Sequence, residues 1–299
     1  MRVLVTGGTG FIGTALIQRL RARGDDITVY CRNAAKAQKL LGNDVTLWTD
    51  FSAWKPEVFF DAVINLAGEP IIDRPWTEKR KQQLCDSRIG LTERLLAAIA
   101  GATRKPEVLL SGSAVGYYGN TADVPCTESF PAGSDFPARL CQGWERSALQ
   151  AEALDIRTVV LRTGLVLHAD GGLLKKMQLP YRCGLGSQLG NGRQMMPWIH
   201  RNDYLDALVF LMDNPDCWGA YNMTAPQPVS NREFTRQLAE SLHRPALLKA
   251  PAWLLKAGLG ERSALVLDGQ QALPERLLQA GFAFKYATLD VALRHAGVH

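Results

Sequence analysis

Three glycines at fixed spacing follow the first apolar run of the chain. Gly8, Gly10 and Gly13 form the pattern G-x-G-x-x-G directly after the β-branched run at residues 2–6. Glycines at these positions permit a tight turn, close approach of a pyrophosphate to the backbone, and close packing of a helix on a strand. The first amides of that helix then face the phosphates, which the helix dipole also favours. The pattern therefore predicts a dinucleotide site, whose expected contacts are Gly7, Gly10, Phe11, Ile12 and Gly13.

The end of the next predicted strand carries a basic residue. Sites for NAD usually place an acidic side chain there, about 20 residues after the glycines, to bind the ribose hydroxyls. Here Asp25 and Asp26 precede the strand, whereas Cys31 and Arg32 follow it. A guanidinium fork at that position suits a 2′-phosphate. The sequence therefore favours NADP(H) over NAD(H), with contacts from Cys31 and Arg32. The alternative is that Arg32 is a solvated surface residue.

Strands and helices that would position these residues alternate along the first two thirds of the chain. The expected strands are residues 2–6, 27–30, 45–48, 61–66, 108–111, 157–161 and 220–224. The expected helices are residues 11–23, 34–41, 77–99, 138–154, 204–212 and 232–242, and an irregular stretch covers residues 169–197. This alternation is typical of an α/β fold with a doubly wound parallel sheet, the dinucleotide-binding Rossmann fold, plus a smaller C-terminal lobe. We expect residues 1–165 with about 198–225 in the binding domain, and about 166–197 with 226–299 in the lobe.

Composition excludes several classes of protein. The chain has 299 residues, of which 46% are hydrophobic, and a net charge of +5, so it is neither disordered nor fibrous. Its basic residues do not cluster, which argues against a nucleic-acid partner. No apolar run reaches the roughly 18 residues of a membrane span. The 6 cysteines are scattered, which predicts neither disulfides nor a metal site and favours a reducing cytoplasm.

Four sequence segments together resemble one large enzyme superfamily. They are the glycine loop, Asn65-Leu66-Ala67-Gly68, Ser111-Gly112-Ser113, and the segment from Trp198 to Asp203. The chain resembles the extended short-chain dehydrogenases/reductases of the epimerase and dehydratase type. More closely, it is similar to an atypical branch of epimerase-family proteins with its own C-terminal segment, which here contains Gly269 to Pro274. The resemblance implies an NAD(P) cofactor, a small-molecule substrate of unknown identity, and a homodimer.

The resemblance also implies particular contacts. Leu66, Ala67 and Gly68 are expected over the adenosine–phosphate part of the cofactor, and Leu165 beside the nicotinamide. Arg88 stands where many relatives have an asparagine, so its cation would hold a cofactor phosphate or an acidic substrate. Glu69 is expected to be a pocket acid that reaches the nicotinamide region. For Arg88, the alternative is that it is an ordinary arginine on the helix surface.

The catalytic residues of such relatives are only partly present. Ser113 matches the serine that hydrogen-bonds a substrate carbonyl. The Tyr-x-x-x-Lys pair of relatives aligns with Pro137 and Cys141, and neither can replace the original residue. Tyr117 is the candidate that we carry forward for the acid/base role. Its neighbour Tyr118 and Arg139 are alternatives.

Two further pairs of residues belong to the second lobe. His200 and Asp203 are expected to brace the lobe rather than react. Arg193 and Gln194, in a glycine-flanked loop, are expected to bind substrate or else to order that loop. Two functions stay open at this point. One is an NADP(H)-dependent oxidoreductase or epimerase-like enzyme acting on a small carbonyl or hydroxyl compound, with nucleotide-linked compounds among the candidates. The other is a non-catalytic NADP(H)-binding sensor or interaction protein.

Overall fold

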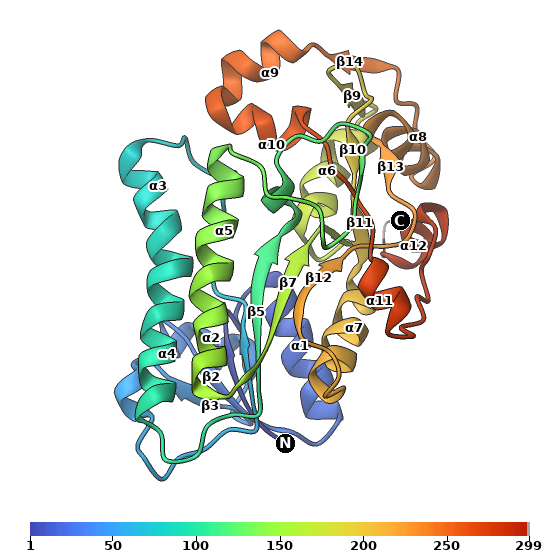
Figure 1. Ribbon diagram of the computed structural model, residues 1–299. Helices are drawn as coiled ribbons and strands as arrows, with labels where there is room; N and C mark the ends of the chain where they lie inside the picture. Colours follow the sequence, from blue (N-terminus) through green and yellow to red (C-terminus); the bar gives the residue numbers. More distant parts are fainter. Residues whose placement is uncertain (298–299) are drawn as a thin grey trace.

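A parallel sheet of seven strands forms the centre of the molecule (Figure 1). In this computed structural model, which describes residues 1–297, the strand order is β12-β7-β5-β4-β1-β2-β3. The strands are β1 (Arg2–Thr6), β2 (Asp26–Tyr30), β3 (Thr46–Trp48), β4 (Ala62–Asn65), β5 (Val108–Ala114), β7 (Arg157–Thr163) and β12 (Gly219–Met223). The predicted doubly wound sheet is confirmed. The winding direction reverses between β1 and β4, and in such sheets the ligand crevice opens at the carboxyl ends of those two strands.

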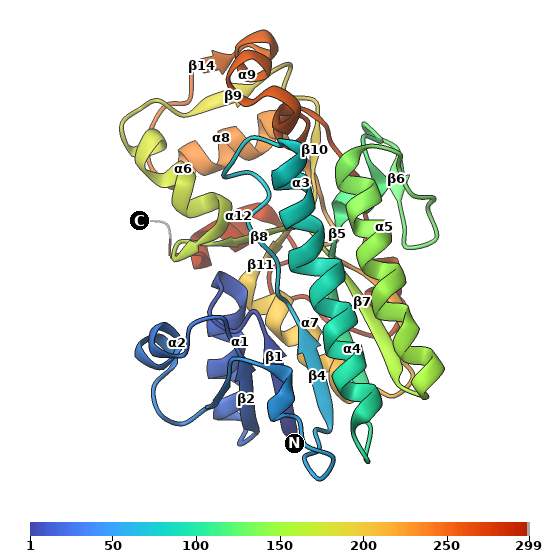
Figure 2. The ribbon, with the colours of Figure 1, turned by 90° about the vertical axis from the view of Figure 1, so that its left-hand side faces the viewer.

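Both faces of this sheet are covered by helices, because alternate side chains of each strand point to opposite faces. Val3 and Val5 pack in the core beneath α1 (Phe11–Ala22), α2 (Ala34–Leu41) and α7 (Arg201–Asp213). Leu4, between them, packs in a second core with α4 (Leu91–Gly101). Helix α5 (Phe136–Leu149) lies beside α4 along the same face (Figure 2).

The long helix expected at residues 77–99 is interrupted. It consists of α3 (Glu78–Cys85), a π-helical segment at Asp86–Gly90, and α4. Thr77 caps α3 as expected, since its side chain accepts a hydrogen bond from the Arg80 amide at 3.2 Å. Hydrophobic periodicity predicted the total length but not the π turn, which shifts the direction of the side chains that follow it. Such turns often lie at functional sites.

The remaining elements build the second lobe and its link to the sheet. They are β6 (Pro125–Cys126), β8 (Leu165–His168), α6 (Gly172–Arg182), β9 (Ser187–Leu189), β10 (Met195–Met196), β11 (Trp198–His200), β13 (Val229–Ser230), α8 (Asn231–Ser241), β14 (Leu248–Ala250), α9 (Ala252–Leu259), α10 (Ala264–Leu267), β15 (Gln271–Ala272), α11 (Glu275–Gln279) and α12 (Leu289–His295). Helix α6 lies in the stretch expected to be irregular. The lobe has its own core around Trp198 and Phe234. Leu277 and Phe282 instead pack into the main core, so the C-terminal segment joins both parts.

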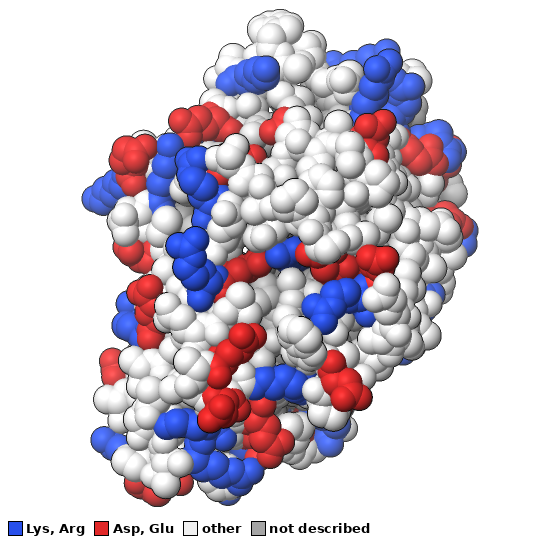
Figure 3. All heavy atoms as spheres, in the orientation of Figure 1, with Lys and Arg blue, Asp and Glu red and all other residues white. Residues whose placement is uncertain are grey.

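Charged residues of both signs are interspersed over the surface shown in Figure 3. No helix within residues 1–297 is both long enough and apolar enough to cross a membrane. In the same range, no three His, Cys, Asp or Glu side chains are grouped so that they could hold a metal ion. All six cysteines are free thiols.

Candidate functional site

The loop between β1 and α1 has contacts that only glycine permits. Gly7 has a φ of +72°, and a Cβ there would lie 2.6 Å from the carbonyl carbon of Leu66. A Cβ at Gly13 would lie 2.3 Å from the carbonyl oxygen of Gly7. The loop is therefore pressed against the end of β4, so the predicted contacts of the glycine loop and those of Leu66 and Ala67 lie side by side at the crevice.

Within residues 1–297, no side chain caps the N-terminus of α1. This 12-residue helix begins after Gly10 without a side-chain cap and without an acidic residue in its first turn. Its first amides and the positive end of its dipole therefore remain uncompensated, and this arrangement fits the pyrophosphate of a dinucleotide. The ring of Phe11 is turned toward the second lobe, because a Cβ at Gly171 would lie only 2.3 Å from it. Phe11 can thus contribute its backbone amide to an anion.

Arg32 lies at the end of β2, where cofactor type is determined. Its side chain is 84% exposed, whereas Cys31 is buried beside it. Burial raises the pKa of the Cys31 thiol, so the thiol stays protonated near neutral pH. Asn33 caps α2 by accepting a hydrogen bond from the Lys36 amide, which fixes the backbone after Arg32. The backbone at the base of this side chain is therefore fixed, while the guanidinium itself is exposed.

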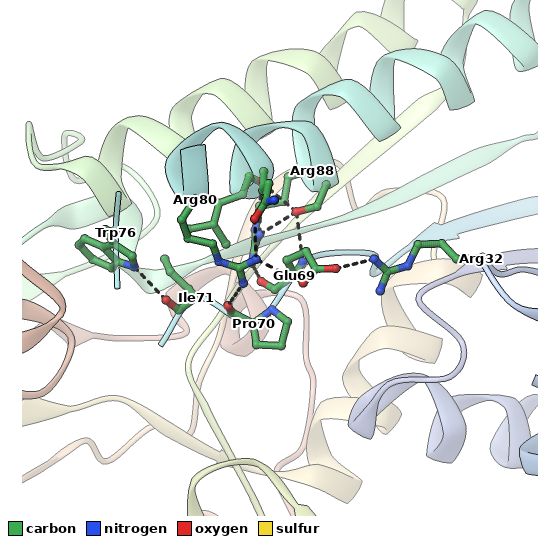
Figure 4. A network of polar contacts seen from close by, with 10 residues as sticks. Arg32, Glu69, Pro70, Ile71, Trp76, Arg80 and Arg88 are labelled. Atoms are coloured by element: carbon green, nitrogen blue, oxygen red, sulfur yellow. Dashed lines mark hydrogen bonds and ion pairs between the residues drawn. The ribbon is translucent and has the colours of Figure 1, made fainter. Parts of the chain in front are cut away.

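Glu69 joins two arginines from different elements (Figure 4). One carboxylate oxygen lies 2.5 Å from Arg32 Nη1, and the other lies 3.5 Å from Nη1 of the buried Arg80. Arg80 is itself fixed, because its Nη2 donates to the Pro70 carbonyl at 2.6 Å. The hydrogen bond from Arg32 lowers the pKa of Glu69, so the carboxylate is ionised. Glu69 was expected to reach the nicotinamide region; its carboxylate instead pairs with Arg32 at the end of β2.

Arg88 projects from the π-helical segment across the end of β4. Its Nη2 donates to the Glu69 carbonyl at 2.9 Å, and its Nη1 lies 3.2 Å from Ser87 Oγ. A Cβ at Gly68 would lie 3.0 Å from the Arg88 Cζ, so glycine makes room for the guanidinium. The guanidinium also lies 5.3 Å from the centroid of the Trp144 ring on α5. Burial lowers the pKa of Arg88, although an arginine remains charged at neutral pH.

The two positions that hold tyrosine and lysine in relatives lie on the first turns of α5. Pro137 belongs to its first turn, and Cys141 lies one turn later and is buried. Burial raises the pKa of the Cys141 thiol to about 11, and the positive charge of Arg88 partly opposes this shift. Pro137 and Cys141 therefore supply neither a titrating group at neutral pH nor a cation. Arg88 is a cation that acts on the Cys141 thiol from the neighbouring π-helical segment.

Ser113 lies at the end of β5 in a buried polar network. Its hydroxyl donates to Glu145 Oε1 at 2.6 Å, and Arg162 donates to both oxygens of the same carboxylate at 2.9 Å. Ser113 is only 4% exposed. Ser113 as a donor to a substrate carbonyl stays a prediction, and it requires the hydroxyl to leave Glu145.

The two neighbouring tyrosines differ in accessibility. Tyr118 is buried; its hydroxyl accepts from Arg162 and donates to Asn222 at 2.7 Å, and burial raises its pKa to about 12. It is therefore a structural residue. Tyr117 is partly exposed and lies with its ring 3.6 Å from the guanidinium carbon of Arg162. An acid/base residue must be accessible to the substrate, and of the two tyrosines Tyr117 meets this requirement.

The predicted residues of the second lobe do not all face the crevice. Gln194 is buried, and its amide donates to the carbonyls of Leu189 and Val266, so it orders the loop. Arg193 beside it is exposed. The Leu165 amide donates to the Pro197 carbonyl at 2.7 Å, which ties the loop after β7 to the lobe. Substrate contact from Arg193 and nicotinamide contact from Leu165 stay predictions.

His200 and Asp203 brace the C-terminal segment as expected. The Asp203 carboxylate accepts hydrogen bonds from the amides of Lys285 and Tyr286 at 3.0 and 2.9 Å. His200 caps α7 by accepting from the Asn202 amide, and its ring lies 3.8 Å from that of Tyr286. Burial lowers the pKa of His200 to about 4, so its ring is neutral.

Sequence reasoning missed the two arginines that organise the site. Arg80 stands in the basic run at residues 79–81, which is typical of a solvated helix face, yet it is 6% exposed and holds Glu69. Arg162 directly follows the expected strand at residues 157–161 and was given no role, yet its ion pair with Glu145 is buried. A basic residue directly after the apolar run at residues 158–161 is the one signal that could have indicated a buried partner.

Together, the glycine loop, the uncompensated helix terminus and the reversal of winding between β1 and β4 define a dinucleotide-binding α/β protein. Comparison with known proteins gives the family. The model of the NAD dependent epimerase/dehydratase family matches residues 3–223, and a domain of unknown function (DUF1731) matches residues 250–296. The chain belongs to the NAD dependent epimerase/dehydratase family. The resemblance stated from the sequence is thereby confirmed, including the separate C-terminal segment.

Individual relatives match along almost the whole chain. The epimerase family protein SDR39U1 homolog, chloroplastic, of Arabidopsis thaliana is 41% identical over 300 residues, covering 98% of this chain and 86% of its own length. Epimerase family protein YfhF of Bacillus subtilis is 37% identical over 295 residues, covering 98% and 97%. The crystal structure of human epimerase family protein SDR39U1 (isoform 2) with NADPH superposes with a TM-score of 0.90 at 34% identity, covering 99% of both chains.

Proposed function

We propose that this protein binds NADP(H) in the crevice between β1 and β4 and uses it to oxidise or reduce a small carbonyl or hydroxyl compound. The observation that carries this proposal is the uncompensated N-terminus of α1 together with an exposed Arg32 at the end of β2. The NADPH in the human structure supports the choice of cofactor that the sequence had favoured. The plant relative is named as chloroplastic, so the cytoplasm remains a prediction for this chain.

The residues that would hold the cofactor come from four elements. The amides after Gly10 would bind the pyrophosphate, and Arg32 would bind the 2′-phosphate. Leu66, Ala67 and Gly68 would line the adenosine side. Arg88 would place a cation near the part of α5 where relatives carry the catalytic lysine. When bound, NADP(H) supplies or accepts hydride.

A non-catalytic sensor is the second candidate. It is favoured by the lack of a titrating side chain at Pro137 and Cys141 and by the engagement of Ser113 with Glu145. Tyr117 is the reason that we favour the enzyme function, because its ring is partly exposed and lies against the Arg162 guanidinium. Consumption of NADPH against a broad panel of carbonyl compounds separates the two candidates. No turnover with any compound, despite tight NADPH binding, would favour the sensor.

Calorimetric titration of NADPH and NADH tests the cofactor assignment. We expect NADPH to bind more tightly than NADH, and Arg32→Ala to remove most of that preference. Charge-assisted hydrogen bonds contribute roughly 1.5–3 kcal/mol each, so the loss for NADPH should be about ten-fold or more. Arg236→Ala is a matched control, since Arg236 is an exposed arginine paired with Glu233 on α8. Equal affinities of the two cofactors for the unaltered protein would overturn the assignment.

A further inference from the structure

Glu69 is held by several groups of the protein, whereas its partner Arg32 is an exposed side chain. The Glu69 amide donates to Ser87 Oγ at 3.1 Å, and its carbonyl accepts from Arg88. Its carboxylate also forms an ion pair with the buried Arg80. The Arg32 side chain, by contrast, is 84% exposed, and within residues 1–297 its hydrogen-bonded partner is Glu69. The pair therefore joins a carboxylate that several groups of the protein hold in place to an exposed guanidinium (Figure 4).

We propose that Glu69 is an internal competitor for Arg32 that sets the affinity for NADP(H). This inference rests on the proposed binding of the 2′-phosphate by Arg32. The Arg32 guanidinium donates one N–H group to the carboxylate. To bind a phosphate with two parallel N–H groups, it must release the carboxylate or share that nitrogen between the two anions. NADP(H) can make that exchange because its 2′-phosphate is a dianion, whereas NAD(H) has no group with which to displace the carboxylate.

The charges around the site favour this role over that of a simple orienting residue. Arg32, Arg80 and Arg88 carry three positive charges, and Glu69 carries one negative charge among them. The 2′-phosphate dianion of an incoming NADP(H) is attracted by the three arginines and repelled by the Glu69 carboxylate. Removing that charge while keeping the shape of the side chain leaves Arg32 free and raises the local positive charge.

Glu69→Gln tests this inference by titration at fixed salt concentration. Because an exposed ion pair has a modest strength, we expect NADPH to bind about two- to five-fold more tightly to the variant. The affinity for NADH should stay unchanged, so selectivity for NADPH should rise. Adenosine 2′,5′-bisphosphate and 5′-AMP serve as fragment probes, and the gain should appear for the first alone. Glu233→Gln on α8 is the matched control, because it also removes a carboxylate paired with an exposed arginine.

The double variant Arg32→Ala/Glu69→Gln separates competition from direct repulsion. If Glu69 acts through Arg32, the glutamine gives no gain in the Arg32→Ala background. An equal gain in both backgrounds would show direct repulsion of the phosphate and overturn the inference, as would unchanged or weaker NADPH binding by Glu69→Gln alone. If Arg32→Ala by itself leaves the preference for NADPH intact, the proposed cofactor recognition fails instead. The two failures are thus distinguishable.

Discussion

Replacement of Ser113 by alanine measures whether this serine acts on a substrate or on the fold. Its hydroxyl is one of two donors to Glu145 Oε1, the other being Arg162 Nε at 2.9 Å. A hydrogen bond to a charged group contributes about 1.5–3 kcal/mol to stability. Because Arg162 remains bound to both carboxylate oxygens, we expect Ser113→Ala to fall at the lower end of that range. For a chain of this size the melting temperature should fall by a few degrees.

The catalytic alternative has a different magnitude. A serine that donates to a developing oxyanion typically contributes about 10²–10³ in kcat. Scanning calorimetry, NADPH titration and turnover of an accepted carbonyl compound should be measured together on Ser113→Ala. We expect a lower melting temperature, unchanged NADPH affinity and a loss of turnover well below 100-fold. Ser263→Ala is the control, since that buried serine donates to a neutral carbonyl in the C-terminal segment. A loss of turnover of 100-fold or more at an unchanged melting temperature would refute this reasoning, because it would show that Ser113 acts on the substrate rather than on the fold.

Two further substitutions test the glycine loop and the brace of the second lobe. Gly10→Val should fold, because its one close contact, 3.2 Å from the Cβ to the Gly7 carbonyl oxygen, needs only a small shift of that carbonyl. It should lose NADPH binding, because the side chain covers the start of α1; circular dichroism and cofactor fluorescence check both expectations. Gly13→Val, whose Cβ would lie 2.3 Å from the same oxygen, should fail to fold. Undiminished NADPH binding by folded Gly10→Val would mean that the loop is only a turn. His200 has a pKa lowered to about 4, so the folded state disfavours its proton, and its contribution to stability is present above about pH 6.5 and lost as the pH falls toward 4. The loss should reach about 3 kcal/mol; His200→Asn should flatten the fall of the unfolding free energy over that range, and an equally steep fall in the variant would contradict the assignment.

The sequence predicted those parts of the molecule that depend on local pattern. The β-branched runs and the glycine spacing depend on period and backbone freedom, which are visible in one dimension, and the seven strands of the sheet lie where they were expected to within a few residues. Helix α6 was not predicted, because Gly171, Gly172 and Pro180 interrupt the pattern and its stability comes from packing on β8 and on the Phe11 ring. The π-helical turn was not predicted either, because it inserts one residue at Asp86–Gly90, where no proline interrupts the helix.

What the sequence could not provide is the pairing of charges. Arg32, Glu69, Arg80 and Arg88 come from four different positions along the chain, and their partners follow from the parallel order of β2, β1 and β4 rather than from spacing. The same order brings a positive charge close to Cys141, the position at which the resemblance implies a lysine in relatives. The π turn projects Arg88 over Gly68 toward Trp144 on α5, so this positive charge comes from the neighbouring helical segment. A site with this arrangement of charges can bind the cofactor even though Pro137 and Cys141 supply no proton donor. Whether the protein is an enzyme therefore depends on Tyr117, the partly exposed tyrosine beside Arg162.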